Sequence, residues 1–192
     1  MNKLNFKNEF KRKIVHYSSS VIGLSIIYLD SEIMLPLLIA SALIFPLLDC
    51  IRINNKFISD IYNSYFHTIT RTFESTKLTG ASFVFIGALI TYILFDPKVA
   101  GIGLIVMSLA DANAAIVGVG YGKIKLLNKS LEGSFAFYMT TFIILYIFKI
   151  PIMISLLVSL ITTLTELIEI PKVNDNISIP ITVGILLTIF GA

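Results

Sequence analysis

One stretch of the sequence, residues 108–134, combines the residue types that a phosphate-binding site needs. It reads SLADANAAIVGVGYGKIKLLNKSLEGS and places Asp111 and Asn113 inside an otherwise apolar helical pattern. Small, basic and hydroxyl residues follow, namely Gly118, Gly120, Gly122, Lys123, Lys125, Lys129, Ser130, Gly133 and Ser134. Lysines and hydroxyls can hold phosphate oxygens, glycines can leave backbone N–H groups free, and a carboxylate can bind a divalent cation. This order of residues predicts a site for a polyphosphate bound with a divalent cation.

The glycines in this stretch are expected to end one helix, and Gly133 and Ser134 to open the next. The N–H groups at a helix N-terminus attract anions, which agrees with a phosphate site. The spacing matches neither a P-loop nor a dinucleotide-binding motif. Close packing of two helices would explain the glycines equally well.

Most other ionisable residues fall at the same ends of the apolar segments. They are Arg12, Lys13 and His16 at the first segment, Arg71 and Glu74 before the third, Glu132 before the fifth, Glu166 and Glu169 at the end of the sixth, and Asp175 before the seventh. Ionisable groups beside a membrane span are costly and need a partner, water or a function. One shared polar cavity near the cytoplasmic face explains their common level.

The elements that must position these residues are membrane-spanning helices. Of the 192 residues, 56% are hydrophobic and 14% charged, whereas soluble domains have about 25% charged residues. The mean hydropathy is +0.87. Since one small core cannot bury this apolar excess, it must face lipid. The sequence predicts an all-α, multi-pass transmembrane bundle with about seven spans, at residues 14–29, 33–51, 80–95, 99–119, 135–149, 151–167 and 177–192.

The distribution of lysine and arginine predicts the orientation of this bundle. Basic residues are in excess in the N-terminal tail and in the segments after the second and fourth spans. By the positive-inside rule the N-terminus is cytoplasmic, the active site faces the cytoplasm and the C-terminus lies outside. Residues 52–79 are expected to form an interfacial amphipathic segment. Residues 1–192 are expected to form a single integral membrane catalytic domain.

Several classes of protein are excluded by what the sequence lacks. No long basic run or zinc-ligand spacing indicates a nucleic-acid partner. A single cysteine, Cys50, cannot form an internal disulfide. The basic start leads into an apolar stretch without a small-residue cleavage site, so we expect the first segment to stay as a helix. The sequence does not indicate an oligomeric state.

At these residues the chain resembles the CTP-dependent lipid-alcohol kinases, which comprise dolichol kinase, phytol kinase and CTP-using diacylglycerol kinase, within the phosphatidate cytidylyltransferase-like superfamily. The resemblance rests on Arg12-Lys13-x-x-His16, Arg71-x-x-Glu74 with Thr79-Gly80-Ala81, Asp111-x-x-Ala114, Gly118-x-x-x-Gly122-Lys123, Lys129-Ser130-x-Glu132-Gly133-Ser134, Glu166 and Asp175-Asn176-x-x-x-Pro180. These motifs run in family order along almost the whole chain, and the block from Lys129 to Ser134 is the most specific. The basic Lys-Asp signature expected near the C-terminus of a cytidylyltransferase is absent, which favours the kinase branch.

The resemblance implies transfer of the γ-phosphoryl group of CTP to the hydroxyl of a membrane lipid, with Mg²⁺ as cofactor. Polyprenol or dolichol is expected ahead of phytol and diacylglycerol. The implied catalytic residues are Asp111, Glu132, Glu166, Arg71, Glu74 and His16, of which Asp111, Glu132 and Glu166 would bind the metal. The implied nucleotide-binding residues are Lys13, Asn113, Gly118, Gly122, Lys123, Lys129, Ser130, Gly133, Ser134, Asp175 and Asn176.

Structural roles remain open for most of these residues. Asp111 can pair with a basic partner such as Arg71, and Arg71 can instead pair with Glu74 on one helix face. Ordinary helix caps would explain the polar residues at helix starts, namely Ser130, Gly133, Ser134, Asp175 and Asn176. The positive-inside rule alone would explain the lysines.

Two other functions are weighed against the kinase. A phosphatidate cytidylyltransferase-like enzyme would make a CDP-lipid and release pyrophosphate. A small transporter would use the same polar cavity as a pathway. A pathway needs polar residues through the full thickness of the membrane, and the outer halves of these segments carry almost none.

Overall fold

The computed structural model describes residues 3–66, 76–168 and 173–191, with side chains from residue 9 onward. It is mostly helical, and its helices are α1 Lys3–Ser18, α2 Ser20–Tyr28, α3 Ser31–Asn54, α4 Lys56–Phe66, α5 Gly80–Leu94, α6 Pro97–Tyr121, α7 Leu131–Ile147, α8 Ile152–Ile168 and α9 Asp175–Ile189. A short antiparallel hairpin, β1 Lys125–Leu126 and β2 Lys129–Ser130, joins α6 to α7. The all-α prediction holds apart from this hairpin.

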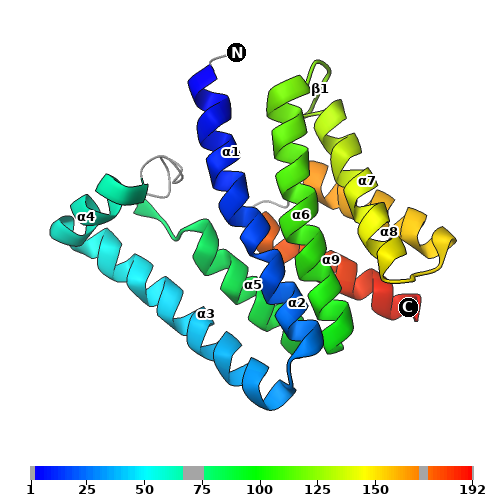
Figure 1. The fold of residues 1–192 in the computed structure, drawn as a ribbon, viewed down its shortest axis with the longest axis horizontal. Coiled ribbons are helices and arrows are strands. Elements are labelled where there is room, and N and C mark those ends of the chain that lie inside the picture. Colours follow the sequence, from blue (N-terminus) through cyan, green and yellow to red (C-terminus); the bar gives the residue numbers. More distant parts are fainter. Residues whose placement is uncertain (1–2, 67–75, 169–172, 192) are drawn as a thin grey trace.

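Helix α6 is the central element of the bundle (Figure 1). Asp96 caps its start by accepting a hydrogen bond from the backbone N–H of Lys98 at 2.9 Å, and Pro97 occupies its first turn. Every residue from Val99 to Ser108 is buried. The most extensive helix packing joins α6 to α7, α2 and α9. Because α6 touches helices from both ends of the chain, residues along it can meet partners from distant segments.

The predicted apolar segments all correspond to helices. The first is interrupted at Ser19, between α1 and α2, and the other six match α3 and α5 to α9 within a few residues. Among the described residues, α3 and α6 are the helices long and apolar enough to cross a membrane. Helices α5 and α9 have 15 residues each, or about 22 Å, against a hydrocarbon core of about 30 Å. The number of spans and the direction of the N-terminus stay predictions.

Large apolar side chains cover the outside of the bundle. Leu43 and Leu47 of α3 are 67% and 60% exposed, and Ile93 of α5 is 65% exposed. Many similar residues lie on α7, α8 and α9. A water-soluble protein rarely exposes so large an apolar surface. The apolar helices therefore indicate a membrane protein.

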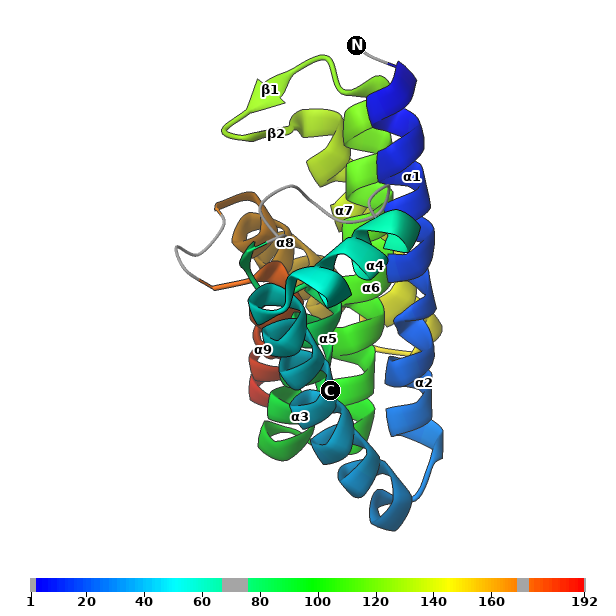
Figure 2. The same cartoon turned by 90° about the vertical axis from the view of Figure 1, so that its left-hand side faces the viewer.

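Helix α4 has a different direction from the long helices. Figure 2 shows it lying across them, near the level at which α5 begins. Its residues include none that are buried, and its apolar side chains Phe57, Ile61 and Tyr65 are exposed. This arrangement agrees with the predicted interfacial segment, whose position relative to a membrane stays a prediction.

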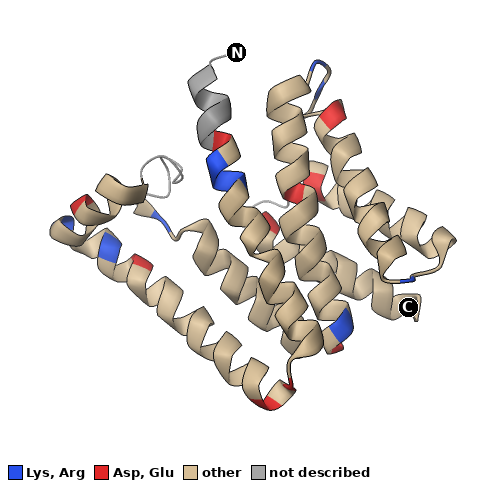
Figure 3. Cartoon of the chain, viewed as in Figure 1, with Lys and Arg blue, Asp and Glu red and all other residues tan. Residues whose placement is uncertain are grey.

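Charged residues are sparse along the helices and gather at their ends and in one band. Figure 3 shows basic residues on α1 at the level of acidic residues on the elements behind it. The hairpin and the N-terminal half of α1 project beyond this band (Figure 2). The candidate site lies in this region.

Candidate functional site

Two cavities open in this band, and we name the first the hairpin cavity. Its volume is about 460 Å³. It is lined by Glu9, Arg12, Lys13, Asp111, Ala114, Ala115, Gly118, Val119, Gly122, Lys125, Asn128, Lys129, Ser130, Gly133, Ser134, Glu166 and Asp175. Asp111, Lys129 and Glu166 come from three separate elements and share this one hollow. The residues from α1, α6, the hairpin, α7, α8 and α9 thus meet as the single-cavity hypothesis requires.

We name the second the α5 cavity, with a volume of about 220 Å³. It is lined by Arg12, Lys13, Val15, His16, Ser19, Tyr62, Thr79, Gly80, Ala81, Val84, Asp111, Asn174, Asp175 and Asn176. Four side chains line both cavities, namely Arg12, Lys13, Asp111 and Asp175. These four residues form a shared wall between the cavities.

Asp111 lies at the centre of the shared wall and is held by α1. Its Oδ2 atom pairs with Nζ of Lys13, and Nε2 of His16 lies 3.1 Å from the same oxygen. Lys13 is only 3% exposed, although the Asp111 side chain keeps 19% of its surface accessible. The sequence allowed for a basic partner of Asp111. The partner in the described structure is Lys13.

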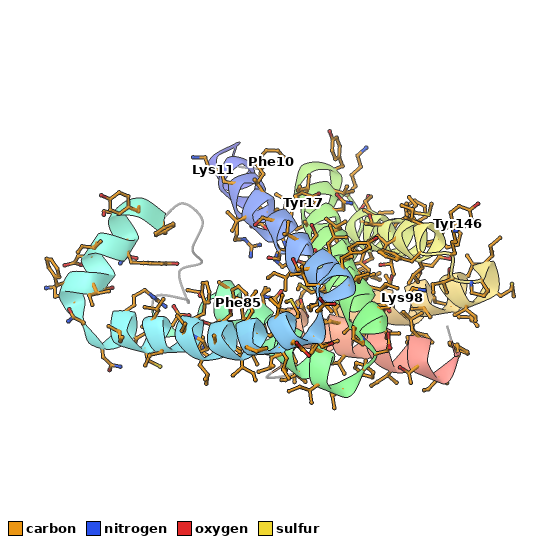
Figure 4. The ribbon with its side chains drawn as sticks, turned by 60° about the horizontal axis from the view of Figure 1, so that its bottom comes forward. Phe10, Lys11, Tyr17, Phe85, Lys98 and Tyr146 are labelled. Carbon is orange, nitrogen blue, oxygen red and sulfur yellow. The ribbon has the colours of Figure 1, made fainter. Side chains whose placement is uncertain are left out.

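Asn113 connects three helices next to this pair. The hydroxyl of Tyr17 donates to Oδ1 of Asn113, and Nδ2 of Asn113 donates to Oγ1 of Thr140 on α7 at 2.9 Å. Figure 4 shows Tyr17 where α1 approaches α6. Asn113 does not line either cavity. Its contacts orient α1 against α6 and α7, which is a structural role for a residue that the resemblance assigned to nucleotide binding.

Lys129 joins the hairpin to the ends of α8 and α9. Its Nζ atom donates to Oε1 of Glu166 at 2.7 Å and lies 3.7 Å from Oδ2 of Asp175. Burial by itself would lower the pKa of Lys129, but the charge and hydrogen bond of Glu166, with the charge of Asp175, raise that pKa above its ordinary value. Lys129 is therefore charged at neutral pH.

The glycine-rich run ends helix α6 only at its last glycine, Gly122, which is the C-cap. Helix α6 continues through Gly118 to Tyr121, and the backbone N–H of Gly122 donates to the carbonyl of Gly118 at 3.1 Å. A Cβ atom on Gly122 would lie 2.8 Å from Oγ of Ser130, and one on Gly133 would lie 2.8 Å from the carbonyl oxygen of Ala114. Close packing of α6 on the start of α7 requires these glycines. The predicted end of the helix is therefore found at Gly122, but Gly118 and Gly120 stay helical and the N–H of Gly122 is not free.

Ser130 and Ser134 have different environments at the start of α7. Ser130 caps the helix, since its Oγ atom accepts from the backbone N–H of Gly133 at 3.1 Å. Ser134 is 6% exposed and lines the hairpin cavity, and its Oγ atom has no hydrogen-bond partner within the described residues. A buried hydroxyl without a partner is unfavourable unless a ligand or water satisfies it. Ser134 can therefore donate to a bound ligand.

Neither Glu132 nor Lys123 is among the described residues that line the two cavities. Oε1 of Glu132 accepts from the backbone N–H groups of Lys123 at 3.0 Å and Ile124 at 3.3 Å. Its own backbone N–H and those two donors lower the pKa of Glu132. In this structure Glu132 holds the entry of the hairpin against the start of α7.

The start of α9 forms one side of the α5 cavity. Asn174 caps the helix by accepting from the backbone N–H of Asn176 at 3.0 Å. Neither Asp175 nor Asn176, which the sequence offered as caps, has this role. Nδ2 of Asn176 donates to the carbonyl of Gly80 at 3.2 Å and so ties α9 to the start of α5. Asp175 remains at the shared wall.

Another aspartate, Asp49 of α3, is buried and was not among the site residues predicted from the sequence. Its Oδ2 atom accepts from the backbone N–H of Thr79 at 2.7 Å, from the Thr79 hydroxyl at 2.8 Å and from Ser82 at 2.6 Å. Its Oδ1 atom accepts from Nε and Nη2 of Arg52 at 3.1 and 3.0 Å. Arg52 also lies 4.9 Å from the ring centre of Tyr62, which lines the α5 cavity. This cluster joins α3, α4 and α5. Asp49 and Arg52 lie about one helical turn apart at the end of an apolar segment, and this spacing was the signal in the sequence that could have indicated the cluster.

Two predicted catalytic residues, Arg71 and Glu74, lie outside the described residues.

The carboxylates near the hairpin cavity are the side chains that could bind Mg²⁺. The described residues contain no group of three or more side chains placed to hold a metal by themselves. Four carboxylates, those of Glu9, Asp111, Glu166 and Asp175, nevertheless line the hairpin cavity. Oε2 of Glu166 is buried without a hydrogen-bond partner in the described part of the chain. Since Mg²⁺ is usually bound through one or two carboxylates together with substrate phosphates, this arrangement fits an ion that arrives with a nucleotide.

Comparison with known proteins gives homologues that match almost the whole chain. No family model matches the chain, and no solved structure matches it. An uncharacterized protein of Rickettsia prowazekii, RP860, is 30% identical over 196 residues, which cover 97% of this chain and 96% of that protein. An uncharacterized protein of Methanocaldococcus jannaschii, MJ1137, is 29% identical over 93% of this chain and 92% of its own length. CTP-dependent diacylglycerol kinase 1 of Saccharomyces cerevisiae is 27% identical over 209 residues, covering 91% of this chain and 71% of the yeast protein.

Proposed function

The chain belongs to one family with RP860, and its distant homology to the yeast enzyme supports a lipid kinase that uses CTP. On this premise we propose that the protein transfers the γ-phosphoryl group of CTP to the hydroxyl of a membrane lipid alcohol. The hairpin cavity would hold the nucleotide at the cytoplasmic side of the bundle. A bilayer would surround the apolar helices.

One observation carries this proposal, namely the meeting of Asp111, Lys129 and Glu166 in one cavity. Its described lining includes four basic side chains and four carboxylates. Without a ligand, the cations Lys13 and Lys129 pair with the carboxylates Asp111 and Glu166. A triphosphate with its metal carries the same two kinds of charge, so it can replace both partners without leaving either uncompensated. The cavity is therefore suited to an exchange of ion pairs.

Each side chain would then have a defined part in phosphoryl transfer. Lys129 and Lys13 would hold phosphate oxygens, and the Ser134 hydroxyl would donate a further hydrogen bond. Glu166 and Asp175 would hold Mg²⁺ together with those oxygens. The bound ion would neutralise the charge that develops on the leaving diphosphate. Asp111, which has access to both cavities, would orient the acceptor hydroxyl and take its proton.

Diacylglycerol is the acceptor lipid that we propose first. The expectation from the family resemblance placed polyprenol or dolichol first, although spans rich in Ile, Leu and Phe suit an isoprenoid chain and diacylglycerol equally well. The relative with a named activity is a diacylglycerol kinase. Diacylglycerol therefore moves ahead of polyprenol and phytol in this proposal.

The reaction is tested with purified protein, CTP labelled in the γ-phosphate, Mg²⁺ and each of three lipids. Diacylglycerol, a polyprenol and phytol form the panel, and both the lipid and the nucleotide products are identified. We expect label on diacylglycerol and release of CDP. With phosphatidate added as a separate acceptor, a CDP-lipid and labelled pyrophosphate would instead identify a cytidylyltransferase, and absence of label on all three alcohols would contradict the proposal.

A matched pair of lysine variants ties the activity to the cavity. Lys129→Ala removes a cation of the hairpin cavity, and Lys98→Ala removes an exposed lysine at the opposite end of α6 (Figure 4). We expect a raised KM for CTP in the first variant only. Equal effects of the two substitutions would contradict a nucleotide site in the hairpin cavity.

A further inference from the structure

The shared wall divides the site into two compartments of different chemistry. Arg12, Lys13, Asp111 and Asp175 line both of them. Beyond this wall, the hairpin cavity is lined by Lys125, Asn128, Lys129 and Ser130 from the hairpin and by small residues of α6 and α7. The α5 cavity has no further lysine or arginine among its described lining residues. Two ligands of different charge are therefore expected on the two sides.

The lining of the α5 cavity combines polar and apolar groups. Asn174, Asn176 and Thr79 bring amide and hydroxyl groups to it, whereas Val15, Ala81 and Val84 bring aliphatic ones. Such a lining suits a small polar head attached to an apolar chain. The volume of about 220 Å³ is less than half that of the hairpin cavity. It can admit the head of a lipid while the chains remain outside.

The apolar rim of the α5 cavity reaches the surface of the bundle. Val15 is 53% exposed and Ala81 is also exposed, and these residues belong to α1 and α5. Among the described residues, α1 packs mainly on α6, whereas α5 packs mainly on α9 and α3. Tyr62 of α4 lines the cavity from a third side. Acyl chains could leave the cavity past these residues into surrounding lipid.

We infer that the α5 cavity binds the hydroxyl-bearing head of the lipid acceptor, while the nucleotide occupies the hairpin cavity, so that phosphoryl transfer takes place at Asp111 in the shared wall. This inference rests on the proposed function. It adds a separate acceptor site with its own residues, formed by α1, α4, α5 and the start of α9.

The chemistry at the shared wall balances with these two ligands. The acceptor O–H bond breaks and its proton passes to the Asp111 carboxylate. A bond forms between the acceptor oxygen and the γ-phosphorus, and the bond from that phosphorus to the β,γ-bridging oxygen breaks, which releases CDP. His16 lies 3.1 Å from Asp111 and lines the α5 cavity but not the hairpin cavity. It is therefore placed to position Asp111 from the acceptor side.

Two alanines provide a matched test. Ala81 lines the α5 cavity and Ala115 lines the hairpin cavity, so leucine at either position narrows one cavity alone. For Ala81→Leu we expect KM for dioctanoylglycerol to rise about tenfold, equivalent to about 1.4 kcal/mol, with KM for CTP unchanged. For Ala115→Leu we expect the opposite selectivity. A change of KM for CTP alone in Ala81→Leu would overturn the assignment of the two cavities.

A binding measurement separates failure of this inference from failure of the proposed reaction. A photoreactive dioctanoylglycerol is crosslinked to the wild-type protein in detergent, and labelled peptides are identified. We expect labels on α1 and α5 that unlabelled diacylglycerol removes and CTP does not. This result in a protein without phosphoryl transfer would retain the lipid site and reject the kinase. Labels confined to the hairpin, or none above a detergent control, would overturn the inference even if the protein is a kinase.

Discussion

Two aspartates, Asp49 and Asp111, pair with basic partners in this bundle but differ in what surrounds them. Both oxygens of Asp49 accept hydrogen bonds, from Thr79 and Ser82 on one side and from Arg52 on the other. Asp49 does not line either cavity. Asp111 is held through one oxygen by Lys13 and His16 and lies between two cavities.

The difference separates a structural carboxylate from one that can take part in chemistry. Asp49 has its acceptor capacity used by donors of α3 and α5, so exchanging any partner would leave a buried group unsatisfied. Asp111 keeps 19% of its side chain accessible and can exchange Lys13 for a ligand. Charge and a basic partner alone do not distinguish these residues. The open space next to them does.

The largest expected effect is on catalysis in Asp111→Asn. An amide cannot take the acceptor proton, and we expect kcat to fall by about 10²–10⁴-fold, the usual contribution of a general base. The rate is measured per folded protein, because Lys13 loses its charged partner in this variant. An unchanged kcat would contradict the claim that Asp111, unlike Asp49, takes part in catalysis.

The second largest effect is on stability in Asp49→Ala. Removing one member of a buried ion pair leaves Arg52 uncompensated, which typically destabilises by about 3–5 kcal/mol. We expect a strongly lowered Tm in detergent and little change in kcat of the protein that remains folded. A selective loss of kcat with a normal Tm would place Asp49 in the catalytic site.

A smaller effect is expected where α6 meets α7. Gly122→Ala puts a Cβ atom 2.3 Å from the carbonyl oxygen of Gly118 and 2.8 Å from Oγ of Ser130. Overpacking of this kind costs about 1–3 kcal/mol, so Tm should fall less than in Asp49→Ala. Gly191→Ala, at an open position of the C-terminal end, offers a control for loss of glycine, although its φ of 63° adds backbone strain. A Tm for Gly122→Ala equal to that of wild type would show that the helices can separate there.

The smallest effect concerns pH. Because the folded-state pKa of Glu132 is lowered, its contribution to stability is present above its ordinary value of 4.5 and is lost as pH falls through the folded pKa. Because the pKa of Lys129 is raised, its contribution is present below the ordinary value of 10.5 and is lost as pH rises through the folded pKa. These groups should leave Tm flat between the two values. In Glu132→Gln the fall of Tm at acid pH should be smaller than in wild type. An unchanged fall of Tm would contradict a stabilising contact between Glu132 and the backbone of Lys123 and Ile124.

The sequence predicted the helices and most of the cavity because both depend on local composition. Asp96 and Pro97 mark the start of α6, and the polar ends of the apolar segments place Lys13, Asp111, Lys129 and Glu166 at one level. Partners across the bundle could not be read from spacing. Asp49 reaches Thr79 and Ser82, which lie 30 and 33 residues away, and no periodic pattern records such a contact.

The hairpin and the glycines show a second limit. The glycine-rich run was expected to end the helix, and it does so at Gly122, but α6 stays helical through Gly118, which packs against Ser130 and Gly133 at the start of α7. Glu132 turns to the backbone of Lys123 and Ile124 because the hairpin, with Leu127 at a φ of 54°, brings them together. Tertiary packing decided both outcomes.

The central claim is tested most directly by a structure of the protein in lipid nanodiscs with CTP and Mg²⁺ bound. The triphosphate is predicted to lie in the hairpin cavity, with the Lys129 ammonium moved from Glu166 to a phosphate oxygen and the Glu166 carboxylate facing the metal. A nucleotide bound elsewhere on the protein, with the Lys129–Glu166 and Lys13–Asp111 pairs both intact, would contradict the account.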